Sequence, residues 1–183
     1  MSGSDQARPL EQTVFDEWPA PTRALFDGGA LATKTGFTAS LLTVDASAHV
    51  RTSLLGVGEL YAPDSRSLCI ALWPQSRAAR VLAQDGRAAL TFVCDDAFYQ
   101  VQLRFDALTD SSAPVTSEGA ESAAGGLACF IGWIDTGETQ RVRYARLTGG
   151  VTFELADQGE AVLDRWERQI EYLKRIAASA SRR

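Results

Sequence analysis

Between residues 37 and 108 the chain repeats short strand-like segments, each ending at a turn signal. The clearest is FYQVQLRFDAL, residues 98–108, whose apolar positions are Tyr99, Val101, Leu103 and Phe105. Alternation with a period of two is typical of a strand with one buried face. The turn signals APDSRS and CDDA separate neighbouring segments at hairpin distance. This pattern restricts the chain to an antiparallel sheet that closes on itself or is covered.

The expected strands are 37–44, 49–62, 68–73, 86–93, 98–108, 127–137, 140–149 and 151–157. Proline residues at positions 19 and 21 favour a short helix before residue 28. A second short helix, 76–83, follows the third strand. A C-terminal helix is indicated by apolar side chains at spacings of three and four: Leu163, Trp166, Ile170, Leu173 and Ala177. The chain is therefore mainly β, a small antiparallel barrel with two short helices and a closing C-terminal helix.

Two further segments have local signals. The stretch 109–126 is small and polar, and we expect a loop or a short helix there. Asp157 and Glu160 have the spacing of a capping box at the start of the C-terminal helix.

We expect a single domain over residues 20–183, preceded by a flexible arm over residues 1–19 that docks through Phe15 and Trp18. No apolar run is long enough for a membrane span, and no secretory signal is visible, so a cytoplasmic location is expected by default. The formal net charge of −5 argues against nucleic-acid binding, which needs a basic surface.

The residue types that often form metal or catalytic centres are few. Cys69, Cys94 and Cys129 are widely spaced in apolar segments, so we interpret them as packing thiols. His49 is the only histidine, which excludes zinc sites built from several histidines. The G-x-S-x-G pattern of a nucleophile elbow is absent. No metal ligand and no catalytic side chain is therefore assigned.

One constellation could bind an anion. Ser76 begins a helical segment and can cap it, and a helix N-terminus favours phosphate. Arg77 adds a planar fork of donors, and Arg80 lies one turn further along. If 49–62 and 68–73 pair around APDSRS, Arg51 also lies far from that turn, as Ser76 does. The alternative is that these arginines are ordinary exposed side chains.

The segments HVRTSLLGVGEL, IALWPQSRAARVLAQDGRAALTFV and FYQVQLRFDAL resemble the pyridoxamine 5'-phosphate oxidase-like FMN-binding split-barrel superfamily. The resemblance implies a split β-barrel and a homodimer with FMN at the subunit interface. It also implies the following roles: Arg51, Ser76 and Arg77 on the FMN phosphate, Thr52 and Ser53 along the flavin, Leu72 and Trp73 near the ring and ribityl chain, and Gln100 reaching the cofactor of the neighbouring subunit.

The chain departs from the oxidase itself at several positions. The oxidase has lysines where this chain has Gly56 and Ala78, and its C-terminal Arg-x-His signature is missing. The first hypothesis is a flavin-dependent oxidoreductase of unknown substrate, using FMN or a related deazaflavin. The second is a non-catalytic carrier or sensor that binds flavin, haem or another ligand. The third is an interaction protein whose ancestral pocket is empty.

Overall fold

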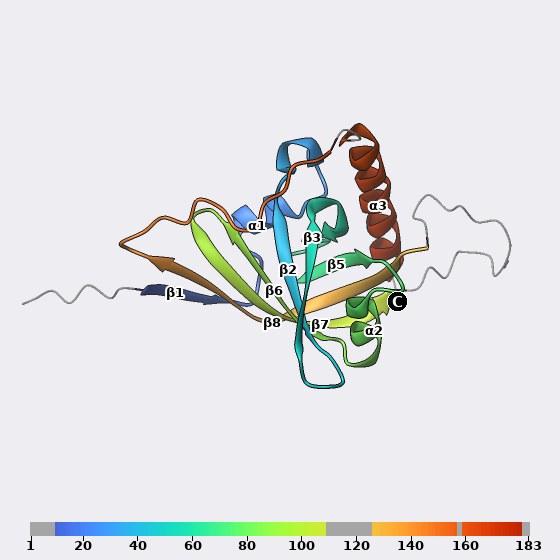
Figure 1. Ribbon diagram of the computed structural model, residues 1–183, viewed down its shortest axis with the longest axis horizontal. Helices are drawn as coiled ribbons and strands as arrows, with labels where there is room; N and C mark the ends of the chain where they lie inside the picture. The colour runs from blue at the N-terminus through green and yellow to red at the C-terminus, as the bar shows by residue number, and fades with distance from the viewer. Residues whose placement is uncertain (1–9, 109–125, 157–158, 181–183) are drawn as a thin grey trace, which may run out of the picture.

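The structure is a computed structural model that describes residues 10–108, 126–156 and 159–180 (Figure 1). Its strands are β1 (Leu10–Phe15), β2 (Thr38–Val44), β3 (Val50–Gly56), β4 (Leu60–Tyr61), β5 (Ser67–Leu72), β6 (Arg87–Cys94), β7 (Ala97–Leu108) and β8 (Ala128–Val142). Its helices are α1 (Ala20–Leu25), α2 (Arg77–Gln84) and α3 (Gly159–Ala180), with 3-10 turns η1 (Leu31–Lys34) and η2 (Val57–Glu59). The described strands pair antiparallel in the order β3-β2-β6-β7-β8-β5-β4, with β1 also on β8.

The long strand β8 organises the sheet. It pairs with β7 along most of its length, while its other edge is shared by β5 in the first half and β1 in the second. β3 forms a hairpin with β2 at one end of the strand order. After β3 the chain crosses to the other end, where β4 pairs with β5. The mainly β split-barrel fold that the sequence predicts is confirmed.

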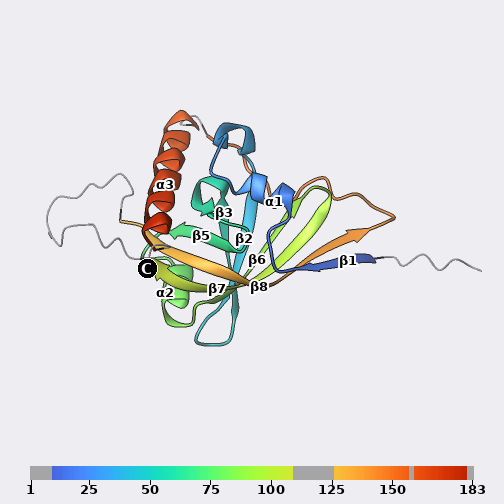
Figure 2. The same ribbon diagram turned by 180° about the vertical axis from the view of Figure 1, so that it is seen from behind.

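The core has two parts because the curved sheet buries both of its faces over part of its area. Inward side chains fill the barrel, for example Leu41, Leu90 and Val101, each with 0% exposure. α2 lies at the lower end of the barrel in Figure 1 and packs its apolar side against this core. The second part lies between the sheet strands β5 and β8 and the helix α3 (Figure 2). Trp166 and Ile170 are buried there.

The predicted helices and most of the strands are observed. α2 and α3 agree with the predictions to within a few residues, and the alternating segment 98–108 forms β7 with its apolar positions buried. The expected single strand 49–62 is instead broken by η2, so that only Leu60 and Tyr61 pair with β5 around APDSRS. The Arg51 half of that segment pairs with β2. The break is packed under α3, where the Trp166 ring lies directly on Gly58.

The N-terminal segment differs from the flexible arm expected over residues 1–19. Residues 10–15 form β1, and the backbone of this strand pairs with Val142 to Gly137 of β8. Trp18 is 3% exposed and its indole Nε1 donates to the carbonyl of Ser67 at 2.9 Å. Docking through Phe15 and Trp18 is therefore confirmed, and residues 10–19 belong to the folded body.

The C-terminal strands also differ. The two segments expected over 127–137 and 140–149 merge into the single strand β8, which ends at Val142. Residues 143–156 contain no strand and run toward α3. The predicted loop 109–126 lies outside the described residues except for Gly126, as does Asp157 of the predicted capping box. No helix in the described part of the chain has the length and apolarity needed to cross a membrane.

Candidate functional site

The N-terminus of α2 has the local geometry that the sequence predicts for an anion site. Ser76 has extended backbone dihedrals, and its Oγ accepts from the amide of Ala79 at 3.1 Å. As the first positions of the helix, Arg77 and Ala78 have amides without an intrahelical acceptor. The Arg77 side chain is exposed, and no residue in the described ranges forms an ion pair or hydrogen bond with its guanidinium. A free guanidinium thus lies beside a helix N-terminus.

The second predicted arginine is held by the β2–β3 hairpin. Arg51 is the cross-strand partner of Thr43, which is buried, and its Nε donates to Asp45 Oδ2 at 2.7 Å. Asp45 Oδ1 in turn accepts from the amides of Ser47 and His49 at 2.9 and 3.0 Å. These hydrogen bonds hold the pKa of Asp45 at about 2.

The topology places the start of α2 and the β2–β3 hairpin at the same end of the barrel. Each neighbouring pair from β2 through β6, β7 and β8 to β5 is antiparallel, so β5 runs in the same direction as β2, and both strands end at the side of the sheet where the β2–β3 turn lies. The β2–β3 hairpin and α2 both lie at the lower end of the molecule in Figure 1. α2 also contacts β2 directly.

The remaining predicted residues divide between the two faces of the sheet. Ser53 shares the inner face with Arg51, whereas Thr52 lies on the outer face opposite Leu42. Gln100 is exposed on β7, in the cross-strand row that contains Thr91 and Glu138.

The residues around the β5–α2 connection differ in exposure. Leu72 is buried in the core, but Trp73 is 57% exposed. Arg80 Nη1 donates to the carbonyl of Gln75 at 2.9 Å, so this side chain already has an acceptor close to the start of α2. Arg77 is the freer of the two helix arginines.

The two positions where the oxidase has lysine belong to the interior here. A Cβ on Gly56 would lie 3.0 Å from Trp166 Cζ2, so the indole occupies the space of a side chain. Ala78 is 2% exposed and packs in the barrel core. Neither position could present a cation without repacking of its neighbours.

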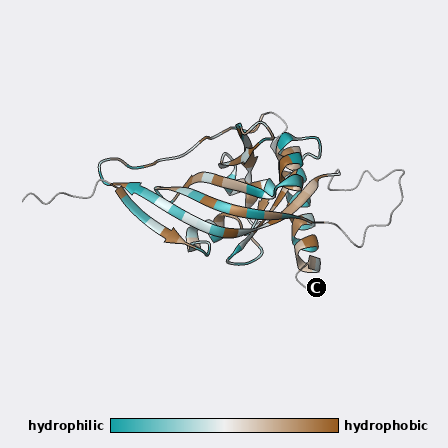
Figure 3. Cartoon of the chain, turned by 90° about the horizontal axis from the view of Figure 1, so that it is seen from below, coloured by the Kyte–Doolittle hydropathy of each residue, from teal (hydrophilic) through white to brown (hydrophobic). Residues whose placement is uncertain are grey.

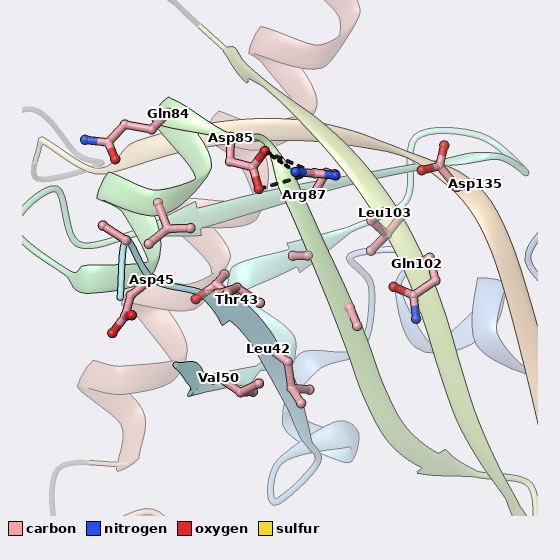
Figure 4. Close-up of a pocket in the computed structure, with 15 residues that line it drawn as sticks. Leu42, Thr43, Asp45, Val50, Gln84, Asp85, Arg87, Gln102, Leu103 and Asp135 are labelled. Atoms are coloured by element: carbon pink, nitrogen blue, oxygen red, sulfur yellow. Dashed lines mark hydrogen bonds and ion pairs between the residues drawn. The ribbon is translucent and has the colours of Figure 1, made fainter. Parts of the chain in front are cut away.

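A hollow beside the β2–β3 hairpin lies between β2, α2, β6 and β7 (Figure 4). It has a volume of about 720 Å³, and none of the predicted cofactor residues lines it. Its apolar lining includes Leu42, Val50 and Leu103, while Gln84 and Gln102 supply amides.

Carboxylates on the rim of this hollow are each paired with an arginine. Asp85 binds Arg87 at 3.0 Å, as Figure 4 shows, and Asp135 lies 3.9 Å from Arg104. Asp45, which also lines the hollow, holds Arg51. The sequence gives no local sign that Asp45 contacts Arg51. The signal that could have found it is the hairpin register, which places Asp45 next to the Thr43–Arg51 pair. In the described part of the chain, no group of three or more histidine, cysteine or acidic residues could hold a metal.

Comparison with known proteins gives relatives at low identity. No family model matches the chain. It is 29% identical over 152 residues to Uncharacterized protein YclD of Bacillus subtilis (strain 168), which covers 82% of this chain and 92% of that protein.

Similar solved structures include a protein described as a candidate pyridoxamine 5'-phosphate oxidase from Lactobacillus delbrueckii, with 14% identity, a TM-score of 0.49 and coverage of 67% of this chain and 94% of that chain. HupZ of Group A Streptococcus is also similar, with 14% identity, a TM-score of 0.46 and coverage of 75% and 99%. An FMN-binding protein from Syntrophomonas wolfei has 12% identity, a TM-score of 0.42 and coverage of 64% and 86%. The solved structures that this chain is similar to thus include pyridoxamine 5'-phosphate oxidase-like and FMN-binding proteins, at low identity.

Proposed function

We propose that this chain is a divergent member of the pyridoxamine 5'-phosphate oxidase-like split-barrel superfamily that binds FMN and acts as a flavin-dependent oxidoreductase. The observation that carries the proposal is the free guanidinium of Arg77 beside the N-terminus of α2, which is capped by Ser76. Arg51 is held at the same end of the barrel and can supply a second guanidinium. A related deazaflavin fits the same reasoning, because it also carries a phosphate group.

The residues present fit a flavin phosphate and its ring. The two amides at the start of α2 and the Arg77 fork are donors, and a phosphate has only acceptors to offer them. The exposed Trp73 ring lies three residues before Ser76 and offers a flat apolar surface for an isoalloxazine ring. Bound FMN would supply the hydride or electron chemistry. The chain would contribute binding, orientation and exclusion of water, which requires no catalytic acid or base from the protein.

We also propose that the chain forms a homodimer through the outer face of the sheet. Neighbouring apolar side chains on β2 and β3 are exposed there: Val44 is 52% exposed, Val50 63% and Leu54 57%. Figure 3 shows hydrophobic and hydrophilic segments alternating along strands of the sheet. Gln100 lies on the same outer face, so a second copy docked there would bring its own Gln100 near this chain.

The proposal is tested by titrating FMN into the purified protein and following flavin absorbance and fluorescence. We expect Arg77→Ala to weaken FMN binding about 10- to 100-fold, since it removes a charge-assisted contact with a dianion. Arg80→Ala is expected to cost less, because Arg80 already donates to Gln75. Arg66→Ala, whose guanidinium binds Asp16 at 3.0 Å, is the control and should bind FMN normally. Equal losses for Arg77 and Arg80 would contradict this ranking.

A non-catalytic flavin carrier is the second candidate, and one observation favours it. The interior placement of Gly56 and Ala78 leaves the site without the two lysines of the oxidase. Bleaching of bound FMN by a nicotinamide cofactor, with turnover in air, would support the enzyme. Stable FMN binding with no reduction by any nicotinamide cofactor would support the carrier. A protein that binds no FMN would contradict both.

A further inference from the structure

Asp45 is an acidic residue with both carboxylate oxygens occupied. Oδ1 accepts from the amides of Ser47 and His49, which closes the turn between β2 and β3. Oδ2 accepts from Arg51 Nε at 2.7 Å. The Asp45 side chain is only 17% exposed. Its carboxylate is held by the hairpin backbone independently of its contact with Arg51.

This contact determines how Arg51 can be used. The hydrogen bond to Nε fixes the plane of the guanidinium, and the two terminal amino groups remain available for another acceptor. Arg51 is also 42% exposed in its side chain, so a ligand can reach it. A free arginine loses considerable rotamer entropy when it is immobilised, and a pre-oriented one has already lost most of it.

We propose that Asp45 is a positioning residue that orients Arg51 for the phosphate of the flavin. This inference rests on the proposed function. The carboxylate is bound to the turn amides, so it does not move with the guanidinium when a ligand arrives. Its low pKa of about 2 keeps it ionised at neutral pH, so the contact with Arg51 persists there.

The test is the substitution Asp45→Asn. Asparagine keeps an oxygen for the amides of Ser47 and His49, but it cannot present a second acceptor to Arg51. We expect FMN affinity to fall about tenfold, while affinity for riboflavin, which lacks the phosphate, stays unchanged. Asp45→Ser, which can also close the turn, should give the same result.

Two controls separate positioning from folding. Asp85→Asn breaks the Asp85–Arg87 pair on the rim of the neighbouring hollow and should leave FMN affinity unchanged. In an Arg51→Ala background, Asp45→Asn should cause no further loss of FMN affinity, because its effect passes through Arg51. Thermal unfolding of each variant shows that the hairpin is intact.

The outcomes are distinguishable from failure of the proposed function. If Arg51→Ala weakens FMN binding but Asp45→Asn binds as tightly as the unchanged protein or more tightly, the positioning role is wrong and FMN binding stands. Equal losses for FMN and riboflavin would also overturn it, because the effect would not involve the phosphate. Failure of the unchanged protein to bind FMN would instead overturn the proposed function, and the role of Asp45 with it.

Discussion

The contact between Gly58 and Trp166 provides a quantitative test of how α3 is held on the barrel. A Cβ at Gly58 would lie 1.9 Å from Trp166 Cγ and 2.4 Å from Trp166 Cβ. Carbon atoms in ordinary contact are about 3.5–4.0 Å apart, so the side chain would have to retreat by roughly 1.5 Å. The atoms approached belong to the base of the side chain, which means that a rotation of the ring cannot relieve the overlap. Helix α3 itself must therefore move.

The expected cost follows from these distances. Overpacking of a well-filled core costs about 1–3 kcal/mol, and complete loss of a buried tryptophan side chain costs about 3–5 kcal/mol. Trp166 is 5% exposed and would be displaced without being lost, so we expect Gly58→Ala to lower the free energy of unfolding by about 3 kcal/mol. The Gly58 φ angle lies outside the left-handed region, so alanine adds no backbone strain, and the effect isolates the overlap.

Urea unfolding followed by tryptophan fluorescence measures this change through the midpoint and slope. The matched control is Gly149→Ala, whose new methyl group would have Thr152 Cγ2 at 4.0 Å as its nearest neighbour. We expect the control to stay within about 0.5 kcal/mol of the unchanged protein. A Gly58→Ala protein that unfolds like this control would refute the packing of Trp166 on η2.

Two further predictions concern the outer face and the cysteines. Leu54→Glu places a charge on the proposed dimer face, so light scattering should show a monomer in place of a species of twice the chain mass. Tyr144→Glu is the control, because Tyr144 is 82% exposed outside the sheet, and it should leave the dimer intact. An unchanged protein that is monomeric would contradict the dimer. Burial raises the pKa of the Cys69 and Cys129 thiols to about 12. At about pH 8 a thiol reagent should therefore modify these thiols only after denaturant unfolds the chain. Rapid modification of either thiol in the native protein would contradict their buried placement.

The sequence predicts a helix or strand well when the residues of that element themselves carry the signal, such as an apolar alternation or a capping residue. The alternation in 98–108 predicts β7 because every second side chain enters the core, and the Ser76 cap predicts the start of α2. β1 has no such signal, since its side chains are almost all exposed. That strand is stabilised by backbone pairing with β8, and such pairing depends on a partner more than 120 residues away in the sequence.

The site divides in the same way. The cap at Ser76 follows from its own neighbourhood, and the sequence predicts it. The partner of Arg51 depends on the register of β2 against β3, which brings Asp45 within reach of its guanidinium. The sequence does not predict the hollow beside α2, because residues from β2, β3, α2, β6, β7 and β8 meet there only in the folded barrel.

The interior positions of Gly56 and Ala78 link packing to the chemistry proposed for the site. At Gly56 the indole of Trp166 takes the space where the oxidase has a lysine, and at Ala78 the buried side of α2 takes it. A lysine restored at Ala78 would have to leave the core, and one at Gly56 would displace the ring that holds α3. Restoring either cation would require these neighbours to move, so under the proposed function a phosphate depends on guanidinium groups and helix amides. Because fewer charges would then hold the dianion, the orientation of each one matters more, and this is the reason to expect a measurable effect from the carboxylate that holds Arg51.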